Sequence, residues 1–292
     1  MKVSYNPSTN IFEPSNNDCL LPQIMWHITD RCYLNCKTCF VKERRLTEPR
    51  RDCEQMLKNL PLFKQLGIQK IDLSGGEPLL FEGLPELVEY AKEEGFHLTI
   101  TTRGIGTEEN RKWLYRNWMN FSRVILSLDG GSAQICDFYS GYSRTFSHAV
   151  DTCLQLNKHG CDRLRINTVV NQCILEDQGR KDLLSLVSTL SPKEWCIIEP
   201  HPSNKTDVFD QYAVTEKEYE SFWDYILSKF ESEQTKILQR RKKMYGTYWA
   251  LYPDNMICRL SECEDAFFSA AFSEENMRLI VEILEQSTSL LP

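Results

Sequence analysis

The chain contains no long hydrophobic run. No stretch of its 292 residues approaches the roughly 18 consecutive apolar residues that a membrane-spanning helix needs. Residues 1–17 contain neither the apolar core of a secretory signal nor an amphipathic anchor. We therefore expect no membrane segment and a cytoplasmic location, in which the twelve cysteines would stay reduced instead of forming disulfides.

The chain also has fewer basic than acidic residues. The chain has 34 Lys and Arg against 41 Asp and Glu, a formal net charge of -7. A protein that binds a long stretch of nucleic acid needs clustered Lys and Arg to neutralise the phosphates, so we expect no broad nucleic-acid surface. A local basic pocket stays compatible with this balance. The five histidines are scattered, and no two stand four residues apart as a metal-binding pair on a helix would.

The composition is that of a folded globular protein, with 41% hydrophobic and 26% charged residues. Apolar stretches that read as strands alternate with stretches of helical periodicity, which is typical of a parallel α/β sheet. The strands are expected at 24–28, 68–74, 96–102, 124–130, 164–170 and 195–199, and the helices at 52–66, 84–94, 108–118, 146–159 and 178–190. Right-handed crossovers between six such strands give either a doubly wound open sheet or a partial barrel.

The regions at the two ends are less regular. Residues 1–20 read as an arm or short hairpin, 21–205 as the main domain, and 206–292 as an extension that would cover the active site. In the extension, Thr215 and Glu218 form a capping-box pattern before a helix that ends near Phe230. A basic patch, an aromatic irregular stretch and a last helix then follow, at 236–243, 245–263 and 274–286.

Three thiols, Cys32, Cys36 and Cys39, fall within eight residues just after the first strand. They are therefore expected on a loop at the carboxyl end of that strand, where active sites of α/β folds are built. Thiolates grouped this closely favour zinc or an iron–sulfur cluster. A closed zinc site needs a fourth ligand, and no second Cys or His pair follows at the usual spacing. Three thiolates on a four-iron cluster leave one iron open. Structural zinc and unligated cysteines stay as alternatives.

A second motif, Gly75-Gly76-Glu77-Pro78, follows the second strand. By itself this sequence forms a turn as often as a ligand site, because Gly allows a positive φ and Pro fixes the exit. The Cys-x3-Cys-x2-Cys spacing followed by this glycine motif, in this order, resembles the radical S-adenosylmethionine (SAM) superfamily.

That resemblance implies an α/β fold with a partial (β/α)6 barrel and an enzyme that carries two cofactors. Cys32, Cys36 and Cys39 would hold a [4Fe-4S] cluster whose open iron is chelated by SAM. The backbone of Gly75, Gly76 and Glu77 would bind the SAM amino group, and its carboxylate and ribose would bind at Ser127, Arg144 and Asn167. An electron donor such as flavodoxin or ferredoxin would reduce the cluster, which cleaves SAM to a 5′-deoxyadenosyl radical that abstracts hydrogen from the substrate. Thr38 stands where the family often has an aromatic residue for adenine packing.

The C-terminal half is similar to viperin-like enzymes, which act on nucleotides. The similarity covers residues 165–171, 175–177, 190–199, 214–222 and 248–259. It implies a small-molecule substrate, a nucleotide or another small molecule, whose anionic group would be held by Lys70, Arg103 and Arg165. Glu194 and Cys196 stand where viperin has cations, so we expect fewer phosphates than three, or none, because each charge-assisted contact is worth about 1.5 to 3 kcal/mol. Aromatic residues of the tail would close over the ligand or cover the barrel bottom: Tyr245, Tyr248, Trp249 and Tyr252.

Two further interpretations are open from sequence alone. The chain could modify a peptide or a natural-product precursor by radical SAM chemistry, or it could be a binding protein that has lost the chemistry. The intact thiol and glycine motifs argue against the latter. Cys258 and Cys263 are similar to parts of the auxiliary cluster domains of peptide-modifying enzymes, but two thiols are too few for a second cluster.

Overall fold

A ten-stranded sheet organises the molecule. The computed structural model describes residues 3–6, 11–14, 23–41, 52–202, 207–242, 248–260 and 266–288. The strand order is β12-β11-β10-β3-β4-β5-β6-β7-β8-β9, and the eight neighbours from β10 to β9 are all parallel. These eight are β3 (Gln23–His27), β4 (Lys70–Ser74), β5 (His97–Thr102), β6 (Phe121–Ser127), β7 (Leu164–Val169), β8 (Glu194–Ile198), β9 (Lys236–Arg240) and β10 (Trp249–Leu251).

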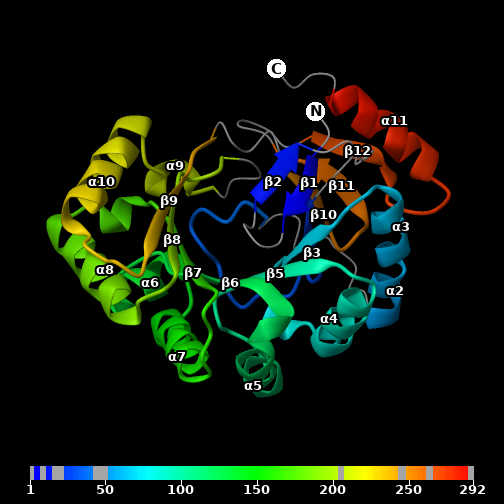
Figure 1. Cartoon of the computed structure of the whole chain (residues 1–292). Helices are drawn as coiled ribbons and strands as arrows, with labels where there is room; N and C mark the ends of the chain where they lie inside the picture. Colours follow the sequence, from blue (N-terminus) through cyan, green and yellow to red (C-terminus); the bar gives the residue numbers. More distant parts are fainter. Residues whose placement is uncertain are drawn as a thin grey trace.

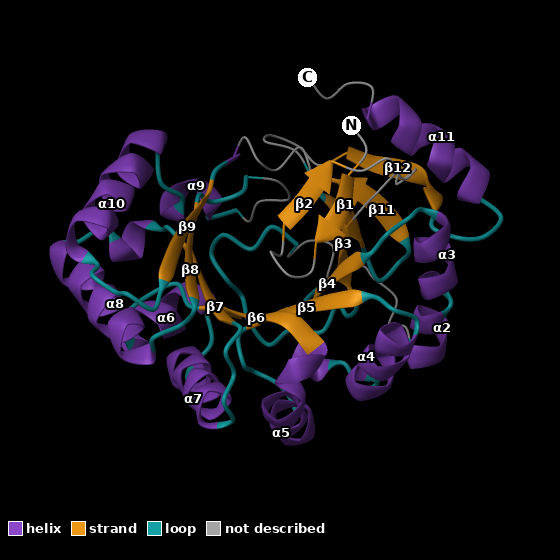
Figure 2. Cartoon of the chain, in the orientation of Figure 1, coloured by secondary structure: helices purple, strands orange, loops and turns teal. Residues whose placement is uncertain are grey.

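The parallel strands curve into an open arc, and helices cover its convex side (Figures 1 and 2). The covering helices are α2 (Cys53–Leu57), α3 (Asn59–Gln65), α4 (Leu84–Glu93), α5 (Glu108–Asn117), α7 (Thr145–Lys158), α8 (Asp177–Leu190) and α10 (Glu216–Lys229). The shorter α6 (Ala133–Ser140) and α9 (Phe209–Tyr212) lie in the loops after β6 and β8, and α11 (Met277–Thr288) ends the described chain. This open α/β barrel confirms the fold class expected from the sequence.

Side chains alternate between the two faces of each strand, and this alternation makes the inside of the arc polar. On β4, Ile71 and Leu73 are fully buried in the core that the strands share with the helices. Lys70, Asp72 and Ser74 are on the opposite face of the strand because side chains in a strand alternate with a period of two. The interior of the arc therefore presents polar and charged groups, and these are the candidates for ligand binding.

Several local signals in the sequence appear in the structure. Thr215 caps α10 and forms a capping box with Glu218. The expected helix at 52–66 is instead two helices, α2 and α3, with Lys58 between them. The reason is Pro61, which has no amide hydrogen to donate to the carbonyl of Leu57 four residues earlier, so the helix is interrupted at that point.

The C-terminal region differs most from expectation. Residues 236–240 of the expected basic patch form β9, and the stretch expected to be irregular contains β10 and β11 (Met256–Arg259). With β12 (Ala266–Ala271), the region from 206 onward adds four strands to the main sheet. The last helix is Met277–Thr288, three residues later than expected at its start. The described part of the arm is a hairpin of β1 (Val3–Asn6) and β2 (Ile11–Pro14).

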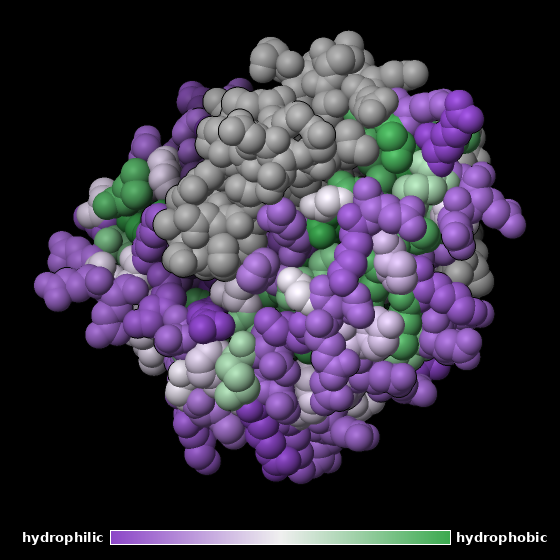
Figure 3. Space-filling view, turned by 45° about the vertical axis from the view of Figure 1, so that its right-hand side comes forward, coloured by the Kyte–Doolittle hydropathy of each residue, from purple (hydrophilic) through white to green (hydrophobic). Residues whose placement is uncertain are grey.

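Hydrophilic side chains dominate the face seen in Figure 3, with hydrophobic ones in small groups between them. None of the described helices has the length and apolar character that would let it cross a membrane.

Candidate active site

The thiol loop, residues 28–41, follows β3 and is fastened on two sides. On one side it meets the glycine loop, residues 74–78, because the amides of Gly76 and Glu77 donate to the carbonyls of Thr29 and Arg31, each at 2.7 Å. On the other side it meets α6, because the amides of Asn35 and Lys37 donate to the carbonyls of Ser140 and Tyr139 at 2.8 and 3.0 Å. In Figure 1 this segment runs within the arc of strands.

The three thiols of the loop influence one another. Cys32, Cys36 and Cys39 are half-buried and form no disulfide with a described residue. Burial raises the pKa of the Cys36 thiol to about 12; the Arg103 guanidinium opposes this shift, and the Cys39 and Cys32 thiols add to it. Among the described residues, no three His, Cys, Asp or Glu side chains converge on a point where one metal ion would bind. Thiolates that hold a cluster need not converge in this way, because they bind different irons.

The two glycines of the motif are required by the contact between the loops. Gly75 has φ +134°, and a Cβ there would lie 2.5 Å from the carbonyl oxygen of Thr29. A Cβ on Gly76 would lie 2.2 Å from the carbonyl oxygen of Arg31. Real Cβ atoms do not approach backbone this closely, so larger residues would displace the thiol loop.

The side chain of Glu77 points into the protein. Its buried carboxylate accepts hydrogen bonds from the amides of Leu79 at 3.2 Å and Arg103 at 2.8 Å, and from the hydroxyl of Thr102. Burial raises the pKa of this carboxyl to about 7, against the lowering effect of those hydrogen bonds. Glu77 therefore fixes the glycine loop to the end of β5.

The expected SAM residues occupy different environments. Ser127 and Asn167 are register neighbours on β6 and β7. Asn167 is 7% exposed, and its Oδ1 has no hydrogen-bond partner within the described ranges. An unsatisfied buried acceptor costs about 1 to 3 kcal/mol, which a ligand with a suitable donor would recover. Arg144 is exposed at the start of α7 with φ 73°, where its amide donates to Asp137 at 2.7 Å.

Next to the thiols, Thr38 and Phe40 have defined partners. The Thr38 hydroxyl hydrogen-bonds the hydroxyl of Tyr139 on α6. The Phe40 ring packs edge-on against His27 at 6.0 Å and His201 at 5.9 Å between centroids. Tyr252 in turn stacks on His27 at 4.5 Å. The end of the thiol loop therefore packs against β10 and β11, in a small core that also contains the buried Cys258. Cys263 lies outside the described residues.

A cavity of about 130 Å³ lies inside the arc near the amino ends of the strands. Four cations line it, Lys70, Arg123, Arg165 and Arg240, together with Asp72, Thr99, Tyr248 and Trp249 among others. Arg165 is 8% exposed, and its Nε has no hydrogen-bond partner among the residues described. The structure therefore brings together Lys70, Arg165 and two of the four tail aromatics. Tyr252 lies in the small core described above, and Tyr245 is outside the described residues.

Two charged groups modify this cavity. Glu194 accepts a hydrogen bond from Arg123 Nη2 at 3.0 Å, and its Oε2 lies 2.8 Å from Arg123 Nε in the same ion pair, so its negative charge is compensated. Burial lowers the pKa of Lys70 to about 8, and the neighbouring Arg123 and Arg165 lower it further while Asp72 and Glu194 oppose them. Arg123 and Arg240 were not expected from the sequence. Arg123 could have been found from the alternation with Ile125 and Ser127 along β6.

Arg103 does not line this cavity, in contrast to the expectation that it would join Lys70 and Arg165. It follows the last residue of β5, whereas Lys70 and Arg165 lie at the amino ends of β4 and β7. In parallel strands these two ends are at opposite rims, so the three side chains do not meet. Arg103 instead pairs with Asp129.

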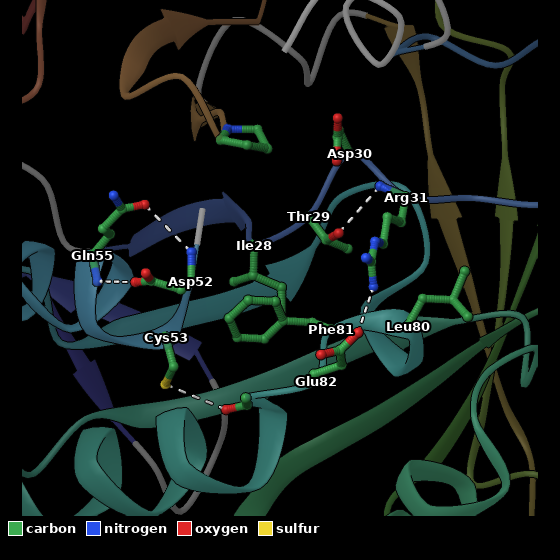
Figure 4. A pocket seen from close by; sticks show the side chains of 12 residues that line it. Ile28, Thr29, Asp30, Arg31, Asp52, Cys53, Gln55, Leu80, Phe81 and Glu82 are labelled. Atoms are coloured by element: carbon green, nitrogen blue, oxygen red, sulfur yellow. Dashed lines mark hydrogen bonds and ion pairs between the residues drawn. The ribbon is translucent and has the colours of Figure 1, made fainter. Parts of the chain in front are cut away.

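A larger cavity, of about 360 Å³, lies beside the first residues of the thiol loop (Figure 4). There the Arg31 amide donates to Thr29 Oγ1 at 3.1 Å, and the Arg31 guanidinium pairs with Glu82 at 2.8 Å. Cys53, on α2, lies in the same cavity and donates to the carbonyl of Gly83 at 3.5 Å. These contacts hold the start of the thiol loop against the segment that follows the glycine loop.

Comparison with known proteins identifies the family. The sequence profile described as "Radical SAM superfamily" matches residues 26–190, more than half of the chain. This chain belongs to the radical SAM superfamily. The matched region contains both the thiol loop and the glycine loop.

Several curated proteins are similar to the chain over most of its length. An S-adenosylmethionine-dependent nucleotide dehydratase of Lacinutrix mariniflava is 27% identical over 258 residues, which are 83% of this chain and 51% of that protein. One of Flammeovirga pacifica is 26% identical over 80% of this chain and 81% of its own length. An AdoMet-dependent heme synthase of Oleidesulfovibrio alaskensis is 27% identical over 80% of this chain and 61% of its own length. The chain thus spans about half the length of the first of these relatives.

Solved structures of radical SAM proteins share the fold. Streptococcus suis SuiB bound to S-adenosylmethionine superposes with a TM-score of 0.64 at 15% identity, covering 88% of this chain and 62% of SuiB. The protein anSMEcpe with bound AdoMet gives 0.62 at 16% identity, covering 81% and 73%. Membership of this superfamily implies an enzyme that uses SAM and a [4Fe-4S] cluster. The grouped thiols and the unsatisfied Oδ1 of Asn167 fit such cofactors.

Proposed function

We propose that this radical SAM enzyme binds its cluster at Cys32, Cys36 and Cys39 and acts on a nucleotide whose phosphate lies in the cation-lined cavity. The observation that carries the proposal is this cavity, which lies inside the same arc whose opposite rim holds the thiol loop. Held by these three thiolates and reduced by an external donor such as flavodoxin or ferredoxin, the cluster would supply the one electron needed to cleave SAM to methionine and the radical that would abstract hydrogen from the substrate.

The residues of the chain hold the two ligands at opposite ends of one space. The backbone of the glycine loop, Ser127 and Asn167 face SAM, and Lys70 and Arg165 face the phosphate. Four rises of about 3.3 Å separate Lys70 from Ser74 on β4, so the two ends are roughly 13 Å apart. A nucleotide aligned with the strands can therefore bind the cations with its phosphate and extend its sugar toward the thiol loop.

The charges of the cavity favour an anion of modest charge. Four cations and one carboxylate, Asp72, line the cavity, and Glu194, which does not line it, pairs with Arg123. Glu194 therefore does not cancel Lys70 or Arg165, although it occupies a position that carries a cation in viperin. We infer a substrate with one or two phosphates. The nucleotide dehydratases among the curated relatives support a nucleotide as the carrier of this group.

The proposed function is tested by incubating the reconstituted enzyme anaerobically with SAM, dithionite and a panel of nucleotides, and measuring 5′-deoxyadenosine by mass spectrometry. We expect one nucleotide to stimulate its formation. In parallel titrations of the SAM-loaded protein, CTP should bind no more than a few fold tighter than CMP, and cytidine more weakly than either. If no nucleotide binds or stimulates, the assignment to nucleotides is wrong, and peptide or natural-product precursors become the substrates to examine.

Substitutions in the cavity are expected to change nucleotide affinity in opposite directions. Arg165→Met removes a buried charge-assisted contact worth about 1.5 to 3 kcal/mol, which corresponds to roughly a 10- to 100-fold weaker Kd. Glu194→Gln frees the charge of Arg123 and should tighten binding. Isothermal titration of SAM-loaded variants checks both. Equal weakening in the two variants would indicate general damage and contradict the assigned roles.

Nucleotide affinity should also depend on pH through Lys70. Because the pKa of Lys70 is lowered to about 8, this cation is present at pH 7 and is lost as the pH rises through that value. We expect the Kd for the nucleotide to increase between pH 7 and pH 9. Lys70→Met should bind more weakly at pH 7 and lose most of this dependence. An unchanged pH profile in Lys70→Met would show that another group titrates.

A further inference from the structure

Arg103 and Asp129 form a buried ion pair at the carboxyl ends of β5 and β6. Nη2 of Arg103 pairs with Oδ2 of Asp129, and the two side chains are 13% and 1% exposed. Both residues are fixed independently. The amide of Arg103 donates to Glu77 Oε2 at 2.8 Å, and Asp129 Oδ1 accepts from the amide of Val169 at 2.7 Å. The guanidinium is therefore held in one place by groups on neighbouring strands.

One nitrogen of this guanidinium donates to no described residue. Nη1 of Arg103 is buried and has no hydrogen-bond partner in the described part of the chain. A guanidinium has five N–H donors and stays charged, so a buried donor without an acceptor is costly unless a ligand satisfies it. The pair therefore points to a group that belongs in the space beside it.

The neighbouring protein groups show which space this is. Arg103 and Asp129 both act electrostatically on Cys36 and on Tyr139, whose hydroxyl bonds Thr38 of the thiol loop. At Cys36 the effect of Arg103, which lowers the thiol pKa, is larger than the opposing effect of Asp129. The hydrogen bonds agree with this placement. Glu77, which accepts from the Arg103 amide, belongs to the glycine loop, and the amides of Gly76 and Glu77 donate to Thr29 and Arg31 of the thiol loop at 2.7 Å. The pair therefore lies beside the thiol loop.

We propose that Arg103 is a positioning residue for the iron–sulfur cluster. Its Nη1 donates a hydrogen bond to a sulfur atom at Cys36, and the positive charge of its guanidinium favours the reduced cluster. Asp129 holds the guanidinium in place and moderates that charge. The proposal rests on the proposed function, because it takes Cys36 as a cluster ligand. Hydrogen bonds to sulfur and the net charge nearby are two of the features that set cluster potentials. The reduction adds one electron from an external low-potential donor and breaks no bond.

This role predicts shifts of opposite sign for the two partners. Arg103→Met removes the positive charge and the donor, so the reduced cluster is disfavoured. Asp129→Asn keeps an oxygen acceptor for Val169 but removes the negative charge, so the reduced cluster is favoured. Arg103→Lys keeps the charge and loses the forked donor geometry. The reduction potential of the cluster in this variant should therefore lie between the potentials in wild type and in Arg103→Met. A merely structural role would shift the variants in the same direction or not at all.

The test is a redox titration of the reconstituted full-length protein without SAM, followed by the electron paramagnetic resonance signal of the reduced cluster. At a fixed poise we expect the ratio of reduced to oxidised cluster to fall roughly tenfold in Arg103→Met, which is 59 mV for a one-electron couple. Asp129→Asn should raise the ratio, and iron content should stay at the wild-type value in both. If Arg103→Met does not load iron, the reduction potentials of the cluster in Arg103→Lys and Asp129→Asn can still be compared with that in wild type.

Three results would overturn the proposal: shifts of the same sign in Arg103→Met and Asp129→Asn, unchanged potentials in loaded variants, or a loss confined to SAM affinity. The last would make Arg103 a ligand of SAM. Failure of the cluster assignment, the part of the proposed function that this proposal needs, is recognised separately, because wild-type protein would then not assemble a cluster at all.

Discussion

Replacement of Cys32, Cys36 and Cys39 by Ala is expected to abolish cluster binding and SAM cleavage together. The three thiols are held on one loop by bonds to the glycine loop and to α6, and the superfamily to which the chain belongs uses a [4Fe-4S] cluster. Removing all three takes away every proposed protein ligand of the cluster. Iron and sulfide analysis after anaerobic reconstitution should fall from about four of each per chain to background, with loss of the charge-transfer absorbance.

Cys53→Ala is the matched control for this experiment. Cys53 is half-buried like the three thiols, but it lies on α2 and donates to the carbonyl of Gly83. Burial raises its pKa to about 11, and the nearby Glu86 adds to the shift. Its place on α2, outside the thiol loop, separates it from the three proposed ligands. Its replacement should leave iron content and SAM cleavage near wild type. Cluster absorbance that survives in the triple variant would disprove the assignment, and zinc bound at the three thiols would establish a structural metal site.

Gly76→Val is expected to have the second largest effect, because it acts on the backbone that carries the thiols. A Cβ at Gly76 would lie 2.2 Å from the carbonyl oxygen of Arg31 and 2.9 Å from that of Asp30. The thiol loop must move to relieve this contact, at a cost of about 3 kcal/mol or more. We expect loss of cluster loading and therefore of SAM cleavage, measured by iron content and by 5′-deoxyadenosine.

Gly95→Ala separates this collision from the general cost of replacing a glycine. Gly95 has φ +85°, but a Cβ there would meet nothing within 4 Å. The substitution should cost about 1 to 2 kcal/mol of stability through the left-handed backbone alone and leave the cluster intact. If Gly76→Val loaded iron as well as Gly95→Ala does, the proposed contact between the two loops would not be required for the site.

The parts of the fold that the sequence predicted are those with strong local signals. The apolar runs at β4 to β8 and the capping box at Thr215 specify their elements without distant contacts. β9 and β10 were missed because both depend on long-range pairing, and β10 has only three residues. Residues Lys236–Arg240 include two charged residues and become a strand by pairing with β8, and Trp249–Leu251 becomes one by pairing with β3.

The candidate site also has parts that the sequence predicted and parts that it did not. The spacing of the thiols and the glycine motif locate the two loops, because chemistry fixes those residue types close together in the chain. The partners of the cations cannot be read from spacing. Arg103 pairs with Asp129, 26 residues later, and Arg123 pairs with Glu194, 71 residues later, because the sheet brings their strands together. Only the three-dimensional arrangement separates Arg103 beside the thiols from Lys70 and Arg165 in the cavity.

We propose that a radical formed from SAM removes hydrogen from the sugar of a nucleotide bound inside the arc. The most direct measurement of this step uses cluster-loaded enzyme, SAM, dithionite and a panel of nucleotides that are deuterated throughout the ribose. We expect 5′-deoxyadenosine made with the substrate nucleotide to carry deuterium, and Arg165→Met to transfer much less of it at the same nucleotide concentration. Unlabelled 5′-deoxyadenosine with every nucleotide in the panel, from enzyme with a full complement of iron, would contradict the proposal.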